Sequence, residues 1–402
     1  MRTDVAIVGA GIGGAALALA LGRRGWRVAL VEREETSPRL ARPEILWSPT
    51  PRALEPLGVA DAIRDVASVA LDGVEIGRAN GVLALSGSDF AAAGITPYST
   101  DPSHTRAILV GAAEATGNVE VHRGVAVEGV KRDGERVVGI RGTRRGGTFE
   151  LEASLVCGDD GGGSVVRKTA GLGDIETTMF PVDFITALIR LPAGMDPRRV
   201  RVFIEPRNLR RGLPAVALFP WPGGQGVLLM PLPHGRTETF FAGPAEELWS
   251  GLRALTPFAP ELESQLRFPG SFARTRLAFG HARSYVVDGA AIIGDAAHPM
   301  SPAGGQGANA SIWDALALAP VADAALRAGD TRRERLLPYE RRRYSANAKS
   351  VALSTLAARL FRAVSPLQVT WVVPLILRAF RASPALRRAL LRRFAASFRT
   401  EG

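Results

Sequence analysis

The feature that most restricts the fold of this chain is a short strand pattern followed at once by a glycine-rich turn. Asp4–Val8 is an apolar, largely β-branched run, and Gly9-Ala-Gly11-Ile-Gly-Gly14 follows it directly. Residues 15–23 then have a helical pattern, and residues 27–31 form a second strand pattern that ends at Glu32. This order predicts a buried β-α-β unit with a tight turn after its first strand.

The three glycines of this turn match the needs of a dinucleotide. Gly9 permits the tight turn, Gly11 lets the backbone approach a pyrophosphate, and Gly14 lets the helix pack on the strand. The phosphates would then lie at the positive N-terminus of the helix. Glu32, 18 residues after Gly14, is placed to accept hydrogen bonds from ribose hydroxyls, which favours FAD or NAD over NADP. The alternative is a glycine-rich turn that binds no ligand.

Two later segments repeat the pattern of a strand followed by an acid. Residues 150–157 read as a strand that leads into GDDGGGSVVR (158–167), and residues 289–294 lead into Asp295 and the loop AAHPMSPAGGQGAN. A simple NAD dehydrogenase requires neither segment. A long cofactor that crosses a discontinuous domain would need both segments and the glycine turn.

The motifs together resemble those of the class A flavoprotein monooxygenases, the family of para-hydroxybenzoate hydroxylase. The glycine turn, the pair Asp160-Gly161 and the segment Gly294-Asp-Ala-Ala-His298 occur in the order of that family. The resemblance implies an α/β fold: a Rossmann-like FAD-binding domain (the para-hydroxybenzoate hydroxylase fold) with an inserted β-sheet substrate domain and a C-terminal helical segment. The expected domains are 1–70, 100–170 and 280–345 for FAD, 71–99 and 171–279 for substrate, and 346–402 for the C-terminal helices.

The resemblance also assigns cofactor contacts. Asp295 would bind the ribityl chain, Pro302, Gly305 and Gly307 would pass beside the isoalloxazine, and Val127 would contact adenine. The expected cofactor-binding residues are Gly9, Gly11, Gly14, Glu32, Arg33, Arg42, Arg106, Val127, Asp160, Asp295, Pro302, Gly305, Gly307, Ala308 and Asn309. No side chain is assigned as catalytic. The sequence departs from the family at Asp159, where alanine is usual, while Arg167 keeps the arginine of the second motif.

The activity that the resemblance implies is oxygenation. NAD(P)H would reduce FAD, O₂ would give a C4a-hydroperoxyflavin, and a small aromatic, polyketide-like or isoprenoid substrate would be hydroxylated or epoxidised. A halogenase, an isoprenoid double-bond reductase and a non-catalytic FAD-binding relative share the fold and stay open. FPWPGGQG (219–226) is not the Trp-x-Trp-x-Ile-Pro signature of the halogenases.

Composition excludes other classes of function. The formal net charge is +11, but seven arginines lie between Arg378 and Arg399 and no nucleic-acid module is recognisable. The single cysteine and five scattered histidines favour neither a disulfide nor a metal site. Because no apolar run of about 20 residues occurs, the sequence predicts a cytoplasmic protein. We expect it to be a monomer or a homodimer. Residues 366–399 read either as a helical cap, which we favour, or as an amphipathic helix for peripheral membrane contact.

The region between the second and third motifs is expected to be rich in strands. The predicted strands are Phe184–Leu191, Val200–Glu205, Pro214–Phe219, Val227–Leu232 and Thr237–Phe241. Residues 331–402 have a helical pattern that prolines interrupt.

Overall fold

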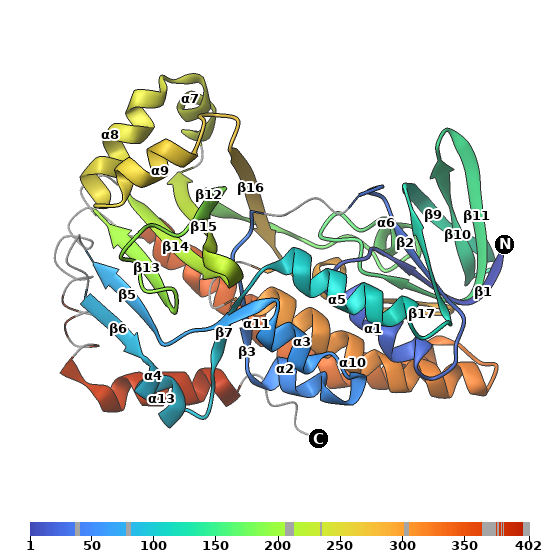
Figure 1. Ribbon diagram of the computed structural model, residues 1–402. Helices are drawn as coiled ribbons and strands as arrows, with labels where there is room; N and C mark the ends of the chain where they lie inside the picture. The colour runs from blue at the N-terminus through green and yellow to red at the C-terminus, as the bar shows by residue number, and fades with distance from the viewer. Residues whose placement is uncertain are drawn as a thin grey trace.

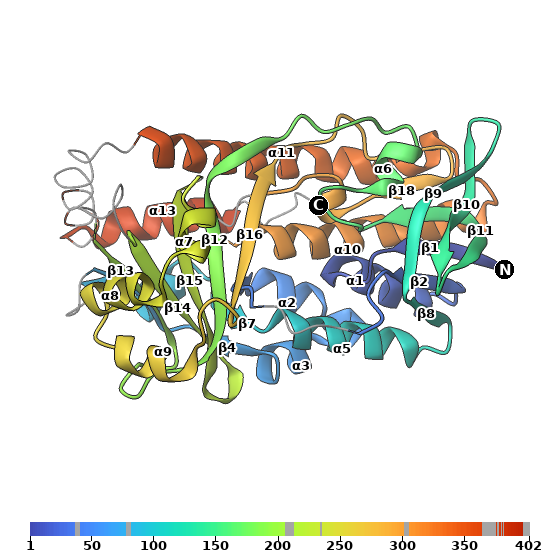
Figure 2. The ribbon, with the colours of Figure 1, turned by 90° about the horizontal axis from the view of Figure 1, so that it is seen from above.

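The computed structural model describes residues 1–36, 41–77, 82–205, 213–233, 235–300, 305–363, 375, 378, 380 and 382–396. The chain forms two lobes, each built on a sheet, and long helices run beneath both (Figure 1). In the view from above, α10 (Gln306–Arg327) and α11 (Arg333–Ala363) lie side by side (Figure 2).

The first lobe contains the predicted β-α-β unit. Its sheet has the order β17-β18-β11-β1-β2-β8, in which β1 pairs in parallel with both β11 and β2. The strands are β1 Arg2–Val8, β2 Val28–Glu32, β8 Val119–Arg123, β9 Val125–Asp133, β10 Arg136–Arg144, β11 Gly147–Gly158, β17 Val286–Val287 and β18 Ala290–Ile292. The three motifs therefore follow neighbouring parallel strands: β1, β11 and β18. Carboxyl ends of parallel strands share one edge, where such sheets bind ligands.

Helix α1 (Ile12–Gly22) is apolar on all sides, as expected for a helix that other elements cover on every side. Every residue from Gly13 to Gly22 is buried. The helix packs between the sheet, α5 (Pro102–Glu114) and α10. A helix with polar and apolar faces would leave charges in this interior.

The second lobe is a largely antiparallel sheet of order β16-β12-β15-β14-β13-β5-β6. Its strands are β5 Gly73–Gly77, β6 Val82–Ser86, β12 Thr178–Arg190, β13 Arg199–Ile204, β14 Ala215–Trp221, β15 Gln225–Pro233 and β16 Phe272–Phe279. Four of the five strands predicted for the insert are confirmed: β12, β13, β14 and β15. Helices α8 (Ala245–Leu255) and α9 (Ala259–Gln265), at the upper left of Figure 1, cover the sheet.

The fifth predicted strand, Thr237–Phe241, is wrong because this segment forms helix α7 (Thr237–Ala242). The buried Thr237 hydroxyl donates to Asp183 Oδ2 at 2.7 Å, and Glu238 in the first turn pairs with Arg274 at 2.8 Å. The two adjacent phenylalanines both pack against Phe268. Adjacent apolar residues suit one face of a helix, whereas a strand would send them to opposite faces.

A small sheet lies between the lobes, in the order β3 (Glu44–Trp47), β7 (Pro97–Thr100), β4 (Ser68–Ala70). Short helices lie near it: α2 Pro49–Ala53, α3 Ala60–Asp65 and α4 Gly87–Ala92. Another short helix, α6 (Val165–Thr169), packs on β9 and β11 of the first lobe instead. At the C-terminal end, α13 (Pro384–Ala396) packs on α4, with Leu391 buried and Arg387 paired with Asp89 at 2.9 Å. None of the helices in the described part of the chain is long and apolar enough to span a bilayer.

Candidate functional site

The glycine turn after β1 leaves no room for side chains. Gly9 has a φ of +100°, and a Cβ on it would collide with the backbone oxygen of Asp159. A Cβ on Gly14 would collide with the carbonyl oxygen of Gly9. Because the first N–H groups of a helix have no partner within it, the N-terminus of α1 offers backbone donors at this turn. One of them, the Gly14 amide, donates to Asp159 Oδ2 at 2.7 Å.

Glu32 ends β2 beside this turn. Its Oε2 accepts a hydrogen bond from the Ala10 amide, and its Oε1 accepts one from the Glu34 amide, both at 3.0 Å. The carboxylate is therefore held at the edge of the sheet where a Rossmann-like domain binds ribose. The neighbouring Arg33 has a side chain that is 78% exposed and that pairs with Glu34 at 3.4 Å.

Among the described residues, three cavities follow one another along this edge. The first, about 460 Å³, lies between the turn and α5 and is lined by Ala10, Arg106, Ala107, Val110, Gly111, Glu114 and Arg123. The second, about 710 Å³, is lined by Gly11, Ile12, Arg42, Glu44, Pro102, Arg106, Asp159, Gly161, Asp295, Gly307, Ala308 and Ser311. The third, about 690 Å³, is lined by Arg42–Ile45, Ala41, Phe184, Thr186, Leu229, Thr275, Leu277, Asp295, Met300 and Gly305–Ala308. Adjacent cavities share lining residues, so they form one elongated site.

The second cavity brings together residues that lie far apart in the sequence. Of the residues expected to bind cofactor, Gly11, Arg42, Arg106, Asp295, Gly307 and Ala308 line it. Arg106 Nη2 is buried and has no hydrogen-bond partner among the described residues. A buried guanidinium nitrogen without a partner is costly, and a phosphate oxygen would satisfy it. This orphaned donor and the bare glycine turn are the features that fit a pyrophosphate.

Glu44 lines the second and third cavities and was not anticipated from the sequence. It begins β3 and accepts a hydrogen bond from Thr100 Oγ1 at 3.2 Å. Burial raises the pKa of Glu44 to about 7, against the lowering effect of Arg42. The group therefore titrates near neutral pH.

The two adjacent acids after β11 have different roles. The Asp160 carboxylate caps α6: it accepts from the amides of Val165 at 2.7 Å and Val166 at 3.0 Å and from the Ser164 hydroxyl. It does not line the cavity, and Asp159 does. The backbone after β11 turns so that the residue before the expected acid, not the acid itself, faces the glycine turn.

The third motif supplies the loop between the second and third cavities. Gly305 precedes α10 in the left-handed conformation (φ +62°), and a Cβ there would lie 3.1 Å from Cβ of Ile45. Helix α10 begins at Gln306, so the amides of Ala308 and Asn309 lie in its first turn. Gly307, expected in the loop, lies in this first turn as well. Pro302 lies outside the described residues.

The side chain of Asn309 has a structural role that the sequence did not indicate. It is fully buried and accepts from the Trp47 amide at 3.0 Å and from Thr50 Oγ1 at 2.7 Å. Its amide nitrogen donates to the carbonyls of Ile45 at 2.8 Å and Gly305 at 2.7 Å. These bonds fix β3 to the start of α10.

The second sheet forms the opposite wall of the third cavity. Phe184, Thr186, Leu229, Thr275 and Leu277 come from β12, β15 and β16 and line this cavity. Thr186 is 3% exposed, and its hydroxyl has no hydrogen-bond partner among the described residues. The wall is apolar apart from the two threonine hydroxyls.

Val127 is not part of these cavities. It lies in β9, where it pairs with Gly142 of β10 and packs against the core of the first lobe.

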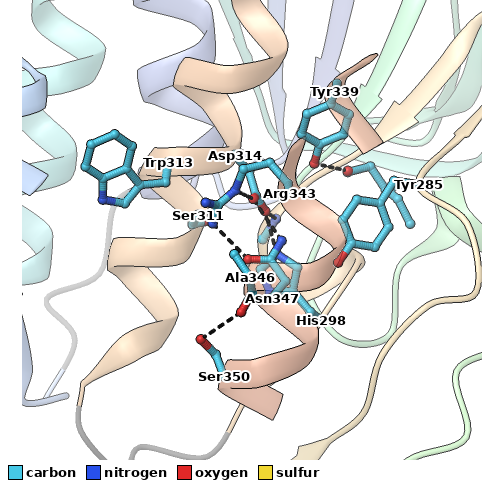
Figure 3. A network of polar contacts seen from close by, with 12 residues as sticks. Tyr285, His298, Ser311, Trp313, Asp314, Tyr339, Arg343, Ala346, Asn347 and Ser350 are labelled. Atoms are coloured by element: carbon cyan, nitrogen blue, oxygen red, sulfur yellow. Dashed lines mark hydrogen bonds and ion pairs between the residues drawn. The ribbon is translucent and has the colours of Figure 1, made fainter. Parts of the chain in front are cut away.

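A buried polar network supports the third motif from behind (Figure 3). The fully buried Asp314 of α10 accepts from His298 Nε2 at 2.5 Å, the Gly294 amide at 3.1 Å, Arg343 Nε at 2.7 Å and Asn347 Nδ2 at 3.0 Å. Burial alone would raise the pKa of Asp314, but His298 and Arg343 lower it well below its usual range. The carboxylate thus ties α11 to the segment that carries Asp295.

These features define what the site can bind. It is elongated, it has helix N-termini at two points, and it has arginines beside the first of them. No group of three or more potential metal-binding side chains occurs among the residues that the structure describes. The arrangement suits a dinucleotide with a planar group at the third cavity, whose far wall would hold a second, largely apolar molecule.

Comparisons with known proteins agree with this geometry. The model of the FAD binding domain family matches residues 2–354. The 6-methylpretetramide 4-monooxygenase of Streptomyces rimosus is 29% identical over 399 residues, 98% of this chain and 92% of that protein. The crystal structure of PqsL of Pseudomonas aeruginosa in complex with 2-aminobenzoylacetate covers 90% of this chain and 97% of its own, with a TM-score of 0.76 and 25% identity. The p-nitrophenol 4-monooxygenase PnpA of Pseudomonas putida shares the fold, with a TM-score of 0.81, 20% identity and coverage of 100% and 99%.

Proposed function

This chain belongs to the class A FAD-dependent monooxygenases, and we propose that it hydroxylates or epoxidises a small aromatic or polyketide-like substrate with O₂ and NAD(P)H. The observation that carries the proposal is the elongated site: its first two cavities suit FAD, and its third ends at a largely apolar wall of the second sheet. Bound FAD supplies the redox chemistry, taking electrons from NAD(P)H and activating O₂.

The residues of the first lobe bind and orient the cofactor in this proposal. The glycine turn admits the pyrophosphate, Arg42 and Arg106 neutralise it, and Glu32 accepts from the adenosine ribose. Asp295 lines both the second and the third cavity, where it would hold the ribityl chain. The first-turn amides of α10 would stabilise the negative charge of a reduced flavin ring bound at the third cavity.

The second sheet binds the substrate in this proposal. Phe184, Leu229 and Leu277 provide apolar contacts, and the unpaired Thr186 hydroxyl orients one polar group of the substrate. No arginine, lysine or histidine of this sheet lines the third cavity among the described residues. The wall therefore favours an uncharged ring over a carboxylate.

We also propose domain boundaries, a cellular location, an oligomeric state and a role for the C-terminal helix. The sheets favour boundaries between the cofactor and substrate domains near residues 70, 100, 170 and 280, and we retain a cytoplasmic monomer or homodimer. The packing of α13 on α4 through Leu391 and Arg387 supports the helical cap rather than peripheral membrane contact through 366–399.

Product analysis under ¹⁸O₂ tests the proposed reaction. The holoenzyme is incubated with NADPH or NADH and a panel of phenols, fused-ring polyketides and aminobenzoyl compounds. We expect one ¹⁸O atom in the product of at least one neutral aromatic substrate. Halogenated product in the presence of halide, or a saturated isoprenoid without ¹⁸O, would instead identify one of the alternative activities. A holoenzyme whose flavin no pyridine nucleotide reduces would be a non-catalytic relative.

A further inference from the structure

Asp159 occupies the hollow that the glycine turn creates. Its Oδ2 accepts a hydrogen bond from the Gly14 amide at 2.7 Å. A Cβ on Gly11 would lie 2.8 Å from that oxygen, and one on Gly13 would lie 3.2 Å from Oδ1. The carboxylate therefore already uses the backbone donor and the space that the glycines leave free at the start of α1.

The other oxygen of this carboxylate reaches the third motif. Asp159 Oδ1 accepts from Ser311 Oγ of α10 at 3.5 Å, and a Cβ on Gly294 would lie 2.5 Å from it. The side chain thus spans the second cavity between the first and third motifs. Alanine, the usual residue of the family at this position, has no oxygen that could make either contact.

We propose that the Asp159 carboxylate competes with the pyrophosphate of FAD for the N-terminus of α1, so that FAD binds only when this carboxyl group is neutral or displaced. The inference rests on the proposed function, because it concerns the same cofactor site. It adds a property that this chain's own sequence creates: weak and pH-dependent retention of FAD.

The charges around Asp159 support this competition. Burial raises its pKa well above the usual range, the neighbouring Asp295, Asp160 and Asp314 raise it further, and the Gly14 amide opposes the shift. The cavity also holds Glu44, so Arg42 and Arg106 face three acids there before any phosphate enters. Two phosphate charges would raise the pKa of Asp159 again, so FAD binding takes up a proton. By linkage, affinity is highest below the pKa of the free protein and falls by up to about tenfold per pH unit above it.

Titration of FAD into the full-length, flavin-free chain tests the proposal. Kd is measured by quenching of flavin fluorescence between about pH 6 and pH 9, above the usual range of a carboxyl pKa, for wild type, Asp159→Asn and Asp159→Ala. We expect wild-type Kd to increase with pH, and both variants to bind FAD at least about tenfold more tightly at pH 8 with a flatter profile. Asp174→Asn removes the same charge at an exposed position and should keep the wild-type profile.

The possible outcomes separate the two proposals. A wild type that binds FAD with a flat pH profile, or an Asp159→Ala variant that binds no more tightly than wild type, overturns the competition and leaves the proposed function intact. A chain that binds no FAD at any pH, in wild type and in all variants, overturns both.

Discussion

Replacement of Asp314 by asparagine should destabilise the protein strongly although it changes almost no volume. The carboxylate accepts four hydrogen bonds, from His298, Gly294, Arg343 and Asn347. Asparagine keeps one acceptor oxygen but directs an NH₂ group at donors. It also leaves Arg343, which is 4% exposed, without its buried counter-charge.

The magnitude follows from burial. Removal of one partner of a buried ion pair costs about 3 to 5 kcal/mol, because the other charge is left desolvated. A chain of 402 residues unfolds with an entropy of about 0.8 kcal/mol/K, so Tm should fall by about 4 to 6 °C. The pKa of Asp314 is lowered in the folded state, so its contribution is complete above its usual value of 3.8 and decreases as the pH falls below it.

Thermal unfolding at pH 7, followed by circular dichroism on holoenzyme and flavin-free protein, measures this effect. Asp323→Asn on the same helix is the matched control, since Asp323 bonds Trp26 and Arg327 near the surface and should cost no more than about 1 kcal/mol. The flavin-free Asp314→Asn variant should show the full decrease, because the network does not depend on ligand. A Tm within about 1 °C of that of the control would show that the buried Asp314–Arg343 pair does not contribute the expected stability.

Further predictions concern the cofactor and substrate sites. Gly14→Ala should abolish FAD binding without preventing folding of the second sheet, because the added Cβ meets the Gly9 carbonyl. Equilibrium dialysis with FAD measures the affinity, and retained affinity would contradict the role of the glycine turn. Thr186→Val should raise KM for a hydroxylated substrate by about tenfold, the effect of losing one hydrogen bond. Thr186→Ser should keep the wild-type KM. Steady-state kinetics measure KM, and equal values in all three proteins would remove Thr186 from the substrate site. Because the pKa of Glu44 is raised to about 7, its ionisation destabilises the folded chain as pH rises from about 4.5 through 7. The Tm of Glu44→Gln should therefore exceed that of wild type increasingly toward pH 8, and a constant difference across that range would contradict the raised pKa.

Much of the cofactor site was predictable because its parts are backbone features. Glycines after β1 and before α10, and an acid after β18, mark where strands end and helices begin, and parallel strands bring these points to one edge. Arg42 and Arg106 belong to no sequence motif and were assigned to the cofactor by resemblance alone. Both line the second cavity.

Other features depend on side-chain directions that periodicity does not give. The sequence assigned Asp160 to the cofactor, but its carboxylate caps α6 while Asp159 faces the glycine turn. Which of two adjacent acids points inward is decided by the turn between β11 and α6. The side chain of Asn309 bonds β3, a segment more than 260 residues away, so no local pattern could reveal it. Helix α7 was not predicted because its first residue, Thr237, is held by a tertiary hydrogen bond to Asp183 of β12. A local sequence pattern does not reveal such a contact.

Stopped-flow absorbance at the flavin band near roughly 450 nm is the most direct test that this chain is a working flavin monooxygenase. The purified protein, loaded with FAD and freed of excess cofactor, is mixed with NADPH or NADH and then with air-saturated buffer. We expect a bound-flavin band that bleaches with at least one of the two reductants and returns in air, faster in the presence of an accepted aromatic substrate. A protein that keeps no flavin after gel filtration at a pH of about 6, where the Asp159 carboxyl group should oppose FAD binding least, would contradict this assignment.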